Sequence, residues 1–270
     1  MIHALKKAIG LVVSAAIFSA AVSAAGAEDN PLGLIEPGKL HVGTISDGRP
    51  YSFIDGEGNF VGFEIDYFND LAKRMGFDEG QVVVTAQDFT ALLPSVANGR
   101  FDVAFAAIGT TPERLKTVDF STGYLAGFMS IMTPDESIKT PKDLAGKRIG
   151  VLQGSIQETY AAKNFKNSEI VRFPSNNAAV VALVNGSISG YFLDYEGGLL
   201  FLKQYPQLKM TINISSSDAP AGFAIKRGNV ALKAALDKAI KESMAEGVWQ
   251  RLYEKWLPGV PMPEQYLPNR

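Results

Sequence analysis

Arg114 is the first residue of this sequence whose type and position suggest chemistry. It lies in the segment 108–114, directly after a strand predicted over 101–107. Thr111 is a residue type that caps helix N-termini and Pro112 suits a first helical position, so we predict that a helix begins here. Free backbone N–H groups beside a guanidinium would bind a carboxylate. A plain surface role for Arg114 is the alternative.

A second polar loop, at Gly154 and Ser155, follows a strand predicted over 148–152. Gly154 lets the chain turn, and Ser155 heads the next predicted helix with its first N–H groups exposed. This arrangement predicts a second place for an anion. Ser155 and Glu158 also match the S-x-x-E capping box, which requires no ligand, so both interpretations stay open.

Asp194 is the third candidate, because it directly follows a strand predicted over 188–193. An acid is a poor strand former and no obvious cap at this place, so its carboxylate could bind an ammonium group; a local turn acid is the alternative. A cation in one half of the chain and an anion in the other are what a zwitterionic α-amino acid requires. Arg114 and Asp194 together therefore predict a site for an amino-acid-like ligand.

Residues for catalysis are scarce. The chain has no cysteine and two histidines, His3 and His41. The motifs G-x-S-x-G, H-E-x-x-H and the P-loop are absent, so acyl transfer by a Ser–His pair, zincin chemistry and nucleotide hydrolysis lack their residues. We expect no cofactor, no metal site and no disulfide. An acid-driven lyase or dehydratase remains open by motif.

The elements that must position these residues follow an α/β pattern. Apolar residues at i, i+3, i+4 and i+7 predict amphipathic helices over 66–75 and 89–98, between strands at 41–45 and 101–107. A similar alternation of strand and helix recurs over 148–193. We therefore predict two α/β lobes, each with a parallel sheet. Ligands of such sheets lie beyond the carboxyl ends of the strands, which is where the candidate residues stand.

The chain is expected to cross between the lobes twice. A strand at 223–225 and a helix over 230–257 form no lobe of their own and are expected to return to the first. We place the crossings near 127–133 and 218–223, and such a double crossing is a natural hinge. The predicted lobes comprise residues 28–129 with 220–270, and residues 130–219.

The N-terminus predicts a secretory signal peptide over residues 1–27. Lys6 and Lys7 precede an apolar run over 8–22 and a small-residue stretch at 23–27. A membrane anchor is the alternative, but the apolar run is shorter than the ~20 residues that a spanning helix needs. Removal of this segment would leave 24 basic and 28 acidic side chains, a net charge of −4, because it contains two of the 26 basic residues and none of the acids. That acidity argues against a nucleic-acid partner.

Several motifs make the sequence resemble the polar amino-acid- and opine-binding family of bacterial periplasmic proteins of ABC importers, solute-binding protein family 3. The resemblance covers nearly all of 38–257. Its motifs are VGFEID at 61–66 (family VGFDID), NGRFD at 98–102 (family SGKFD), TPER at 111–114, VDFS at 118–121, DLAGKRIGV at 143–151 (family DLKGKKVGV) and YEKW at 253–256.

The resemblance implies a type II two-lobe fold that closes around its ligand by hinge motion and is recognised by an inner-membrane ABC permease. Arg114 then resembles the arginine that clamps the α-carboxylate, and Asp194 the acid that holds the α-ammonium. The loop at 155–157 resembles the one that donates backbone N–H groups to the same carboxylate. The complete set of expected ligand-binding residues is Arg49, Ala107, Gly109, Arg114, Ser155, Ile156, Gln157 and Asp194.

Four positions depart from the family pattern. Ile45 replaces an acid that often helps to bind the amine, and Gly48 stands where an aromatic ring usually stacks on the ligand. Gly109 replaces a serine and Ile156 a threonine. Smaller side chains should enlarge the pocket, so we hypothesise a bulkier, opine-like amino-acid conjugate, with Arg49 as an extra contact to a second carboxylate or a sugar hydroxyl.

Two other classes of protein remain as alternatives. A secreted enzyme on the same fold, such as a dehydratase for a carboxylated substrate, would also use Arg114 but would need an acid of raised pKa aimed at a leaving group. A receptor's sensor domain or a chemotaxis co-receptor would bind the same ligand and would signal only through a partner. The preferred interpretation is a monomeric periplasmic binding protein, not an enzyme, that delivers an amino-acid-like ligand to its permease.

Overall fold

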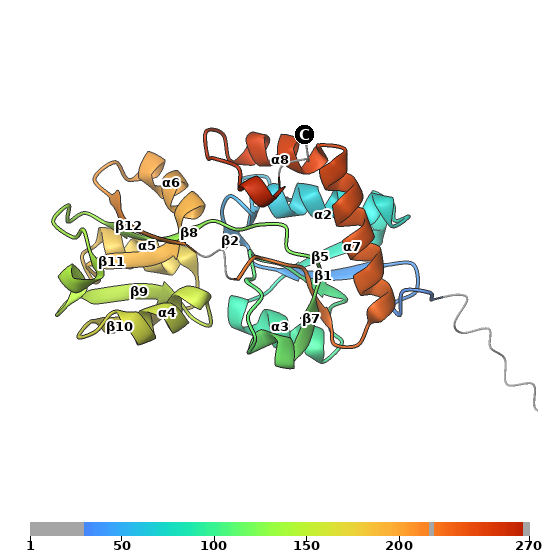
Figure 1. Cartoon of the computed structure of the whole chain (residues 1–270), viewed down its shortest axis with the longest axis horizontal. Helices are drawn as coiled ribbons and strands as arrows, with labels where there is room; N and C mark the ends of the chain where they lie inside the picture. The colour runs from blue at the N-terminus through green and yellow to red at the C-terminus, as the bar shows by residue number, and fades with distance from the viewer. Residues whose placement is uncertain (1–29, 216–218, 267–270) are drawn as a thin grey trace, which may run out of the picture.

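The computed structural model describes residues 30–215 and 219–266 (Figure 1). The predicted signal peptide over 1–27 lies outside these residues. Among the helices that the structure describes, none is long and apolar enough to cross a bilayer. The described chain forms two α/β lobes side by side, each with its own five-stranded sheet, which confirms the predicted fold class.

The first lobe is built on a mixed sheet. In order across this sheet the strands are β5 (Val82–Ala86), β1 (Leu40–Thr44), β6 (Val103–Ala104), β13 (Ala224–Lys226) and β7 (Val118–Phe120). Strand β1 runs parallel to β5 and β6, whereas β13 arrives from later in the chain and runs antiparallel to β6 and β7. Most of β1 is buried on both faces, as is typical of a strand covered by helices on either side.

The second lobe repeats this arrangement. Across its sheet lie β10 (Glu169–Phe173), β9 (Arg148–Leu152), β11 (Gly190–Asp194), β8 (Phe128–Thr133) and β12 (Lys209–Ser215). Its helices are α4 (Ile156–Asn164), α5 (Asn176–Val184) and α6 (Tyr195–Gln204). Strand β9 runs parallel to β10 and β11, and β8 is antiparallel to β11 and β12. The parallel strands of the two lobes therefore have the same order, which agrees with the predicted similarity.

Four longer helices cover the first sheet. They are α2 (Phe63–Arg74), α3 (Phe89–Ala97), α7 (Val230–Ala245) and α8 (Val248–Trp256). Helices α2, α7 and α8 contribute to one apolar cluster and α3 to another, so they lie on opposite faces of the sheet (Figure 1). The single helix predicted over 230–257 is wrong in one respect. The chain breaks at Gly247, whose φ of 69° is left-handed.

Short elements complete the first lobe. Strands β2 (Asp47–Gly48), β3 (Ser52–Ile54) and β4 (Phe60–Val61) form a small antiparallel sheet. The first lobe's 3-10 turns are η1 (Glu79–Gln81), η2 (Arg114–Lys116) and η4 (Glu264–Tyr266). A further 3-10 turn, η3 (Pro141–Leu144), belongs to the second lobe. The helix predicted to begin at Pro112 is only η2, because the chain returns at once to the buried strand β7.

The two crossings between the lobes pair with each other. The N–H of Tyr124 donates to the carbonyl of Ala221 (2.9 Å), and the N–H of Ala221 donates to the carbonyl of Leu125 (2.7 Å). The first crossing ends before Phe128, where strand β8 of the second sheet begins, so it meets the predicted range of 127–133 only at its start. The lobe boundaries at 129/130 and 219/220 stay a prediction.

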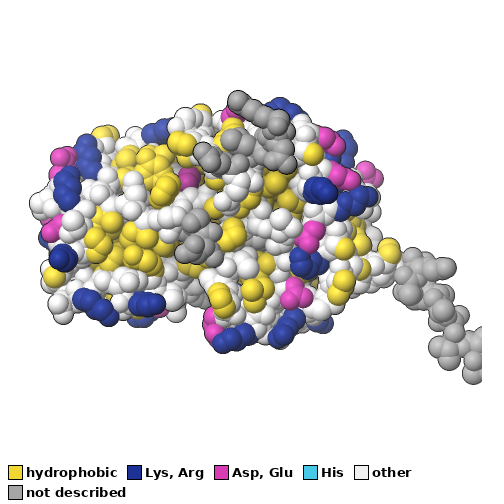
Figure 2. All heavy atoms as spheres, in the orientation of Figure 1, with side chains coloured by type: hydrophobic (Ala, Val, Ile, Leu, Met, Phe, Trp, Pro, Cys, Tyr) yellow, Lys and Arg dark blue, Asp and Glu magenta, His cyan; other side chains and the backbone are white. Residues whose placement is uncertain are grey.

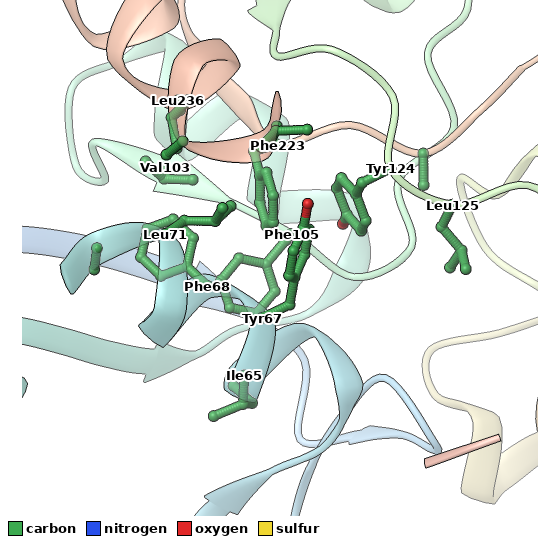
Figure 3. Packing of buried hydrophobic residues seen from close by; sticks show 14 of the residues in the cluster. Ile65, Tyr67, Phe68, Leu71, Val103, Phe105, Tyr124, Leu125, Phe223 and Leu236 are labelled. Carbon is green, nitrogen blue, oxygen red and sulfur yellow. The ribbon is translucent and has the colours of Figure 1, made fainter. Parts of the chain in front are cut away.

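Aromatic packing anchors both crossings to the first lobe (Figure 3). The ring of Tyr124 stacks on Phe223 with centroids 4.2 Å apart, and Phe223 meets Phe105 edge-on at 5.6 Å. The indole N–H of Trp249, in α8, donates to the carbonyl of Tyr124 (2.9 Å). Residues on either side of the second lobe's segment thus share one core, which fixes the first lobe's end of the hinge.

Candidate functional site

A cavity lies between the lobes, with about 620 Å³ of empty space that includes open solvent at its mouth. The structure places all of the sequence-predicted residues in its lining. From the first lobe these are Arg49, Ala107, Gly109 and Arg114, and from the second they are Ser155, Ile156, Gln157 and Asp194. The carboxyl ends of β1, β9 and β11 reach it, as expected for ligand sites of parallel sheets.

The guanidinium of Arg114 bridges the two lobes. Its Nη1 donates to the carbonyl of Gly109 (2.7 Å), and its Nη2 donates to the carbonyl of Gly154 (2.9 Å). The ring of Phe89 lies 5.7 Å from the guanidinium carbon. Burial lowers the pKa of Arg114 to about 10, which means that the charge is poorly hydrated here. A carboxylate next to it would offset that loss of hydration.

The start of α4 lies beside Arg114, and its predicted capping box forms only in part, because the carboxylate of Glu158 reaches the N–H of Gly154 and not that of Ser155. The hydroxyl of Ser155 accepts from the N–H of Glu158 (3.1 Å), and the Glu158 carboxylate accepts from the N–H of Gly154 (2.7 Å). The hydroxyl oxygen of Ser155 therefore accepts a hydrogen bond within the protein, and its O–H can still donate. The N–H groups of Ile156 and Gln157 belong to the first turn of α4, where no intrahelical acceptor exists, so they are suited to an anion.

Asp194 is the last residue of β11 and the N-cap position of α6, but its side chain makes no capping bond. Instead its Oδ1 accepts from the side-chain amide of Gln157 (2.7 Å). Burial, followed by the charge of Glu196, raises the pKa of Asp194 to about 7. A carboxyl group held in this way favours a positively charged partner.

Tyr51, which lines the cavity, and its partner Glu196, which lines an adjoining hollow, were not predicted from the sequence. The Glu196 side chain is buried, and its Oε2 accepts from the hydroxyl of Tyr51 (3.1 Å), which comes from the other lobe. Burial raises the pKa of Glu196. In the sequence Glu196 looks like an ordinary acid in a first helical turn, so nothing marks it as a cavity residue.

Ala107 has a left-handed backbone, with a φ of 48°, which is rare for a residue with a side chain. Its N–H donates to Oε1 of Glu64 (2.8 Å), and the same carboxylate accepts from the hydroxyl of Tyr124. Glu64 is fully buried in α2. The carboxylate therefore holds both a cavity residue and a residue of the first crossing in place.

Two of the four departures from the family pattern do not enlarge the pocket as expected. A Cβ atom at Gly48 would lie 2.6 Å from Cδ1 of Ile45, so Ile45 occupies the space next to this glycine. A Cβ atom at Gly109 would lie 2.9 Å from the carbonyl of Ala219 and 3.5 Å from Ile156. A side chain at Gly109 would meet the backbone, and one at Gly48 would require Ile45 to change its rotamer, so neighbouring atoms already occupy the space next to both glycines.

Arg49 lines the cavity, but its guanidinium is engaged elsewhere. The guanidinium carbon lies 3.8 Å from the ring centroid of Phe53, a cation–π distance. The ring of Phe53 in turn meets Trp256 edge-on at 5.9 Å. Arg49 would have to leave Phe53 to reach a ligand, so its expected contact with a second carboxylate stays a prediction.

Further contacts join the lobes around the cavity. The N–H of Asn177, at the start of α5, donates to Oδ2 of Asp47 (2.9 Å) in the first lobe. The bonds from Tyr51 to Glu196 and from Arg114 to Gly154 also cross from one lobe to the other.

Figure 2 shows that Lys and Arg side chains are scattered along the outer edges of the visible face.

Comparisons with known proteins agree with this geometry. Residues 40–259 match the family model of bacterial extracellular solute-binding proteins, family 3. The ABC transporter arginine-binding protein 1 of Escherichia coli strain K12 is 30% identical over 224 residues, which cover 82% of this chain and 91% of that protein.

Two solved structures are also similar. An ancestral arginine-binding protein bound to arginine has 33% sequence identity and a TM-score of 0.77, covering 81% of this chain and 98% of that chain. The ancestral amino acid-binding protein AncCDT-1, a precursor of cyclohexadienyl dehydratase, has 28% identity and a TM-score of 0.75, covering 84% and 99%. The sequence match and the two-lobe structure together show that this chain belongs to the bacterial extracellular solute-binding proteins of family 3.

Proposed function

We infer that this protein captures an amino acid outside the cytoplasm and delivers it to the permease of an ABC importer. One observation carries this conclusion: a single cavity between the lobes is lined by Arg114 from the first lobe and Asp194 from the second. These are the two charges that an α-amino acid needs. The names of the relatives, which are binding proteins for arginine or for amino acids, support the same function.

In this proposal the α-carboxylate lies against the guanidinium of Arg114 and the first N–H groups of α4, at Ile156 and Gln157. The α-ammonium lies against Asp194, which Gln157 orients through its side-chain amide. Both charged groups of the ligand then replace water around buried protein charges. Because the two sets of contacts come from different lobes, a bound ligand favours the closed arrangement.

The remaining parts of the proposal concern the protein as a whole. We propose that 28–129 with 220–270 and 130–219 move as two bodies, and that the permease recognises their closed form. The protein is proposed to be a periplasmic monomer whose signal peptide is removed before Glu28. N-terminal sequencing of the secreted protein tests the cleavage site, and size-exclusion chromatography with light scattering tests the monomer.

The ligand is tested by a thermal-shift screen of the mature protein against free amino acids and opine-type conjugates. A ligand at 100 times its Kd adds about 2.7 kcal/mol to the free energy of unfolding, which is easily measured. The shift should vanish in Arg114→Ala and persist in Arg148→Ala, an arginine on the surface of the second lobe. No shift with any amino acid or conjugate would contradict the proposed function, whereas a shift with conjugates alone would favour the bulkier ligand.

A secreted enzyme on the same fold is the second candidate, and the raised pKa of Asp194, to about 7, is the observation that favours it. Such a carboxyl group could act as a general acid. We propose instead that the ligand is released unchanged. Incubation with the ligand from the screen, followed by mass spectrometry, should recover all of it; formation of a product would favour the enzyme.

A further inference from the structure

A second hollow opens from the ligand cavity toward the hinge, with about 350 Å³ of empty space that includes open solvent. It shares Tyr51, Ala107 and Asp194 with the main cavity. Residues of both crossings, 125–128 and the segment around Ala221, line its inner side. The hollow is therefore an extension of the ligand site and lies against the part of the chain that must bend when the lobes close.

Glu196 supplies the charge of this hollow. Its side chain is almost entirely buried, with only 5% of the residue exposed, and the hydroxyl of Tyr51 donates to its Oε2 (3.1 Å). A Cβ atom added at Gly127 would lie 2.5 Å from its Oε1, so the carboxylate lies directly against the backbone of the first crossing. The carboxylate thus touches the other lobe through Tyr51 and the hinge through Gly127.

Together the cavity and the hollow are lined by three acids, Asp47, Asp194 and Glu196, and by two bases, Arg49 and Arg114. In the part of the chain that the structure describes, neither Asp194 nor Glu196 forms an ion pair with a Lys, Arg or His side chain. The charge of Glu196 contributes to the raised pKa of Asp194, so the two carboxylates destabilise each other's ionised form. The α-ammonium of a zwitterion can compensate only one of them.

We propose that Glu196 and Tyr51 form a subsite for a second positive charge of the ligand, an ammonium or guanidinium group on its side chain. This inference rests on the proposed function and names the class of amino acid that the site prefers. The cation lies against the carboxylate of Glu196 and the ring of Tyr51, whose hydroxyl already donates to Oε2 of Glu196. Because these residues come from different lobes and Glu196 abuts Gly127, a cation in this subsite stabilises the closed form directly.

The test compares ligands that differ in charge but hardly in shape. The pairs are arginine with citrulline, lysine with norleucine, and ornithine with norvaline, and each Kd is measured by isothermal titration calorimetry. For the wild-type protein we expect at least one cationic member to bind about tenfold or more tightly than its neutral partner, since a buried carboxylate gains a charged hydrogen bond. In Glu196→Gln the ratio of the Kd of the neutral member to the Kd of the cationic member should fall toward one.

Glu113→Gln is the matched control, because Glu113 is an exposed acid of the first lobe that pairs with Lys116. It should leave the ratio unchanged. Should Glu196→Gln fail to fold, Glu196→Ala removes the same carboxylate, and measurable binding of the neutral ligand shows that a variant is folded.

The outcomes separate this subsite from the general function. A wild-type ratio near one in every pair, or a ratio that Glu196→Gln leaves intact, overturns the subsite while amino-acid capture through Arg114 stands. Loss of binding of every amino acid and conjugate to the wild-type protein would instead reject the proposed function, and the subsite with it.

Discussion

Buried carboxyl groups set the chemistry of the cavity. Burial raises the pKa of both Glu64 and Asp194 to about 7, and it also raises the pKa of Glu196. At Asp194 and Glu196, which line the cavity and its hollow, a proton and a positively charged ligand group therefore compete for the same carboxylate. Because the ionised form is what binds a cation, the protonation state of these residues should control affinity.

The first prediction concerns the pH dependence of binding through Asp194. The free carboxyl group has a pKa of about 7, and an ammonium beside it lowers that pKa, so below pH 7 a proton must leave when the ligand binds. The Kd should rise by up to about tenfold per pH unit as the pH falls from 7 to 5. Isothermal titration calorimetry at pH 8, 7, 6 and 5 measures this change in Kd. Asp194→Asn should bind more weakly with a flatter profile, and a constant wild-type Kd would contradict the prediction.

The second prediction concerns stability and Glu64. Its pKa in the folded protein, about 7, lies above the ordinary value of 4.5, so the folded state binds more protons than the unfolded state between these values. This contribution to stability is complete below about pH 4.5 and is lost as the pH rises toward and through 7. Glu64→Gln keeps the shape but cannot ionise.

We therefore expect the Tm of the wild-type protein to fall more between pH 5 and pH 8 than the Tm of Glu64→Gln. Differential scanning calorimetry at both pH values gives the comparison. Glu57→Gln is the control, because Glu57 is exposed in the turn after β3. Its Tm should fall between pH 5 and pH 8 by as much as that of the wild-type protein. Equal slopes for the wild type and Glu64→Gln would show that Glu64 does not titrate in this range.

Secondary structure elements decide which candidate residues meet. Strand β11 ends at Asp194, and the first turn of α6 then places Glu196 in the wall of the hinge-side hollow. The turn η2 is too short to provide a helix N-terminus, so in the proposed site Arg114 contributes its guanidinium and not a helix dipole. The N–H groups that we propose to bind the carboxylate come instead from α4, a helix of nine residues.

The third prediction belongs to the break between α7 and α8. Gly247 has a φ of 69°, which costs a residue with a Cβ atom about 1–2 kcal/mol. Gly247→Ala should therefore lower the free energy of unfolding by roughly this amount, measured by urea denaturation. Gly56→Ala should be neutral or slightly stabilising, because a Cβ atom there meets nothing within 4 Å. Equal stability of the two variants would contradict the prediction.

At the scale of the whole molecule, ligand capture depends on contacts between the lobes. The crossings pair with each other through Tyr124, Leu125 and Ala221, which gives a narrow hinge. Away from the hinge, few polar contacts join the described parts of the lobes, and one of them is the carboxylate of Asp47 accepting from the N–H of Asn177. This contact joins the lobes beside the cavity, which Asp47 also lines.

The fourth prediction tests this contact between the lobes. Asp47→Ala should raise the Kd several-fold, since the closed form loses a charge-assisted hydrogen bond between the lobes. Small-angle X-ray scattering should also show a larger mean radius of gyration without ligand.

Asp119→Ala is the control, because its carboxylate likewise accepts a backbone N–H, from Gly228 (2.8 Å), but within one lobe. If both variants bound ligand equally well, the contact at Asp47 would not contribute to closure.

Much of the architecture was predictable from the sequence. The apolar spacing of helices and buried strands repeats along the chain, and local periodicity depends only on residue order, so two α/β lobes could be inferred. The carboxyl ends of parallel strands then placed Arg114, Ser155 and Asp194 near a common site. The break at Gly247 and the short turn η2 were missed because the length of a helix also depends on how the next segment of the chain packs.

The sequence alone determined the fold class, the family and the charged pair Arg114 and Asp194, because these depend on local patterns and motifs. Only the tertiary structure decided that Tyr51 meets Glu196, that Ile45 fills the space beside Gly48 and that Arg49 lies on Phe53. Such contacts join residues whose approach depends on how lobes and loops pack. The spacing of residues along the sequence does not show these contacts, because burial and the distance between the lobes are properties of the folded chain.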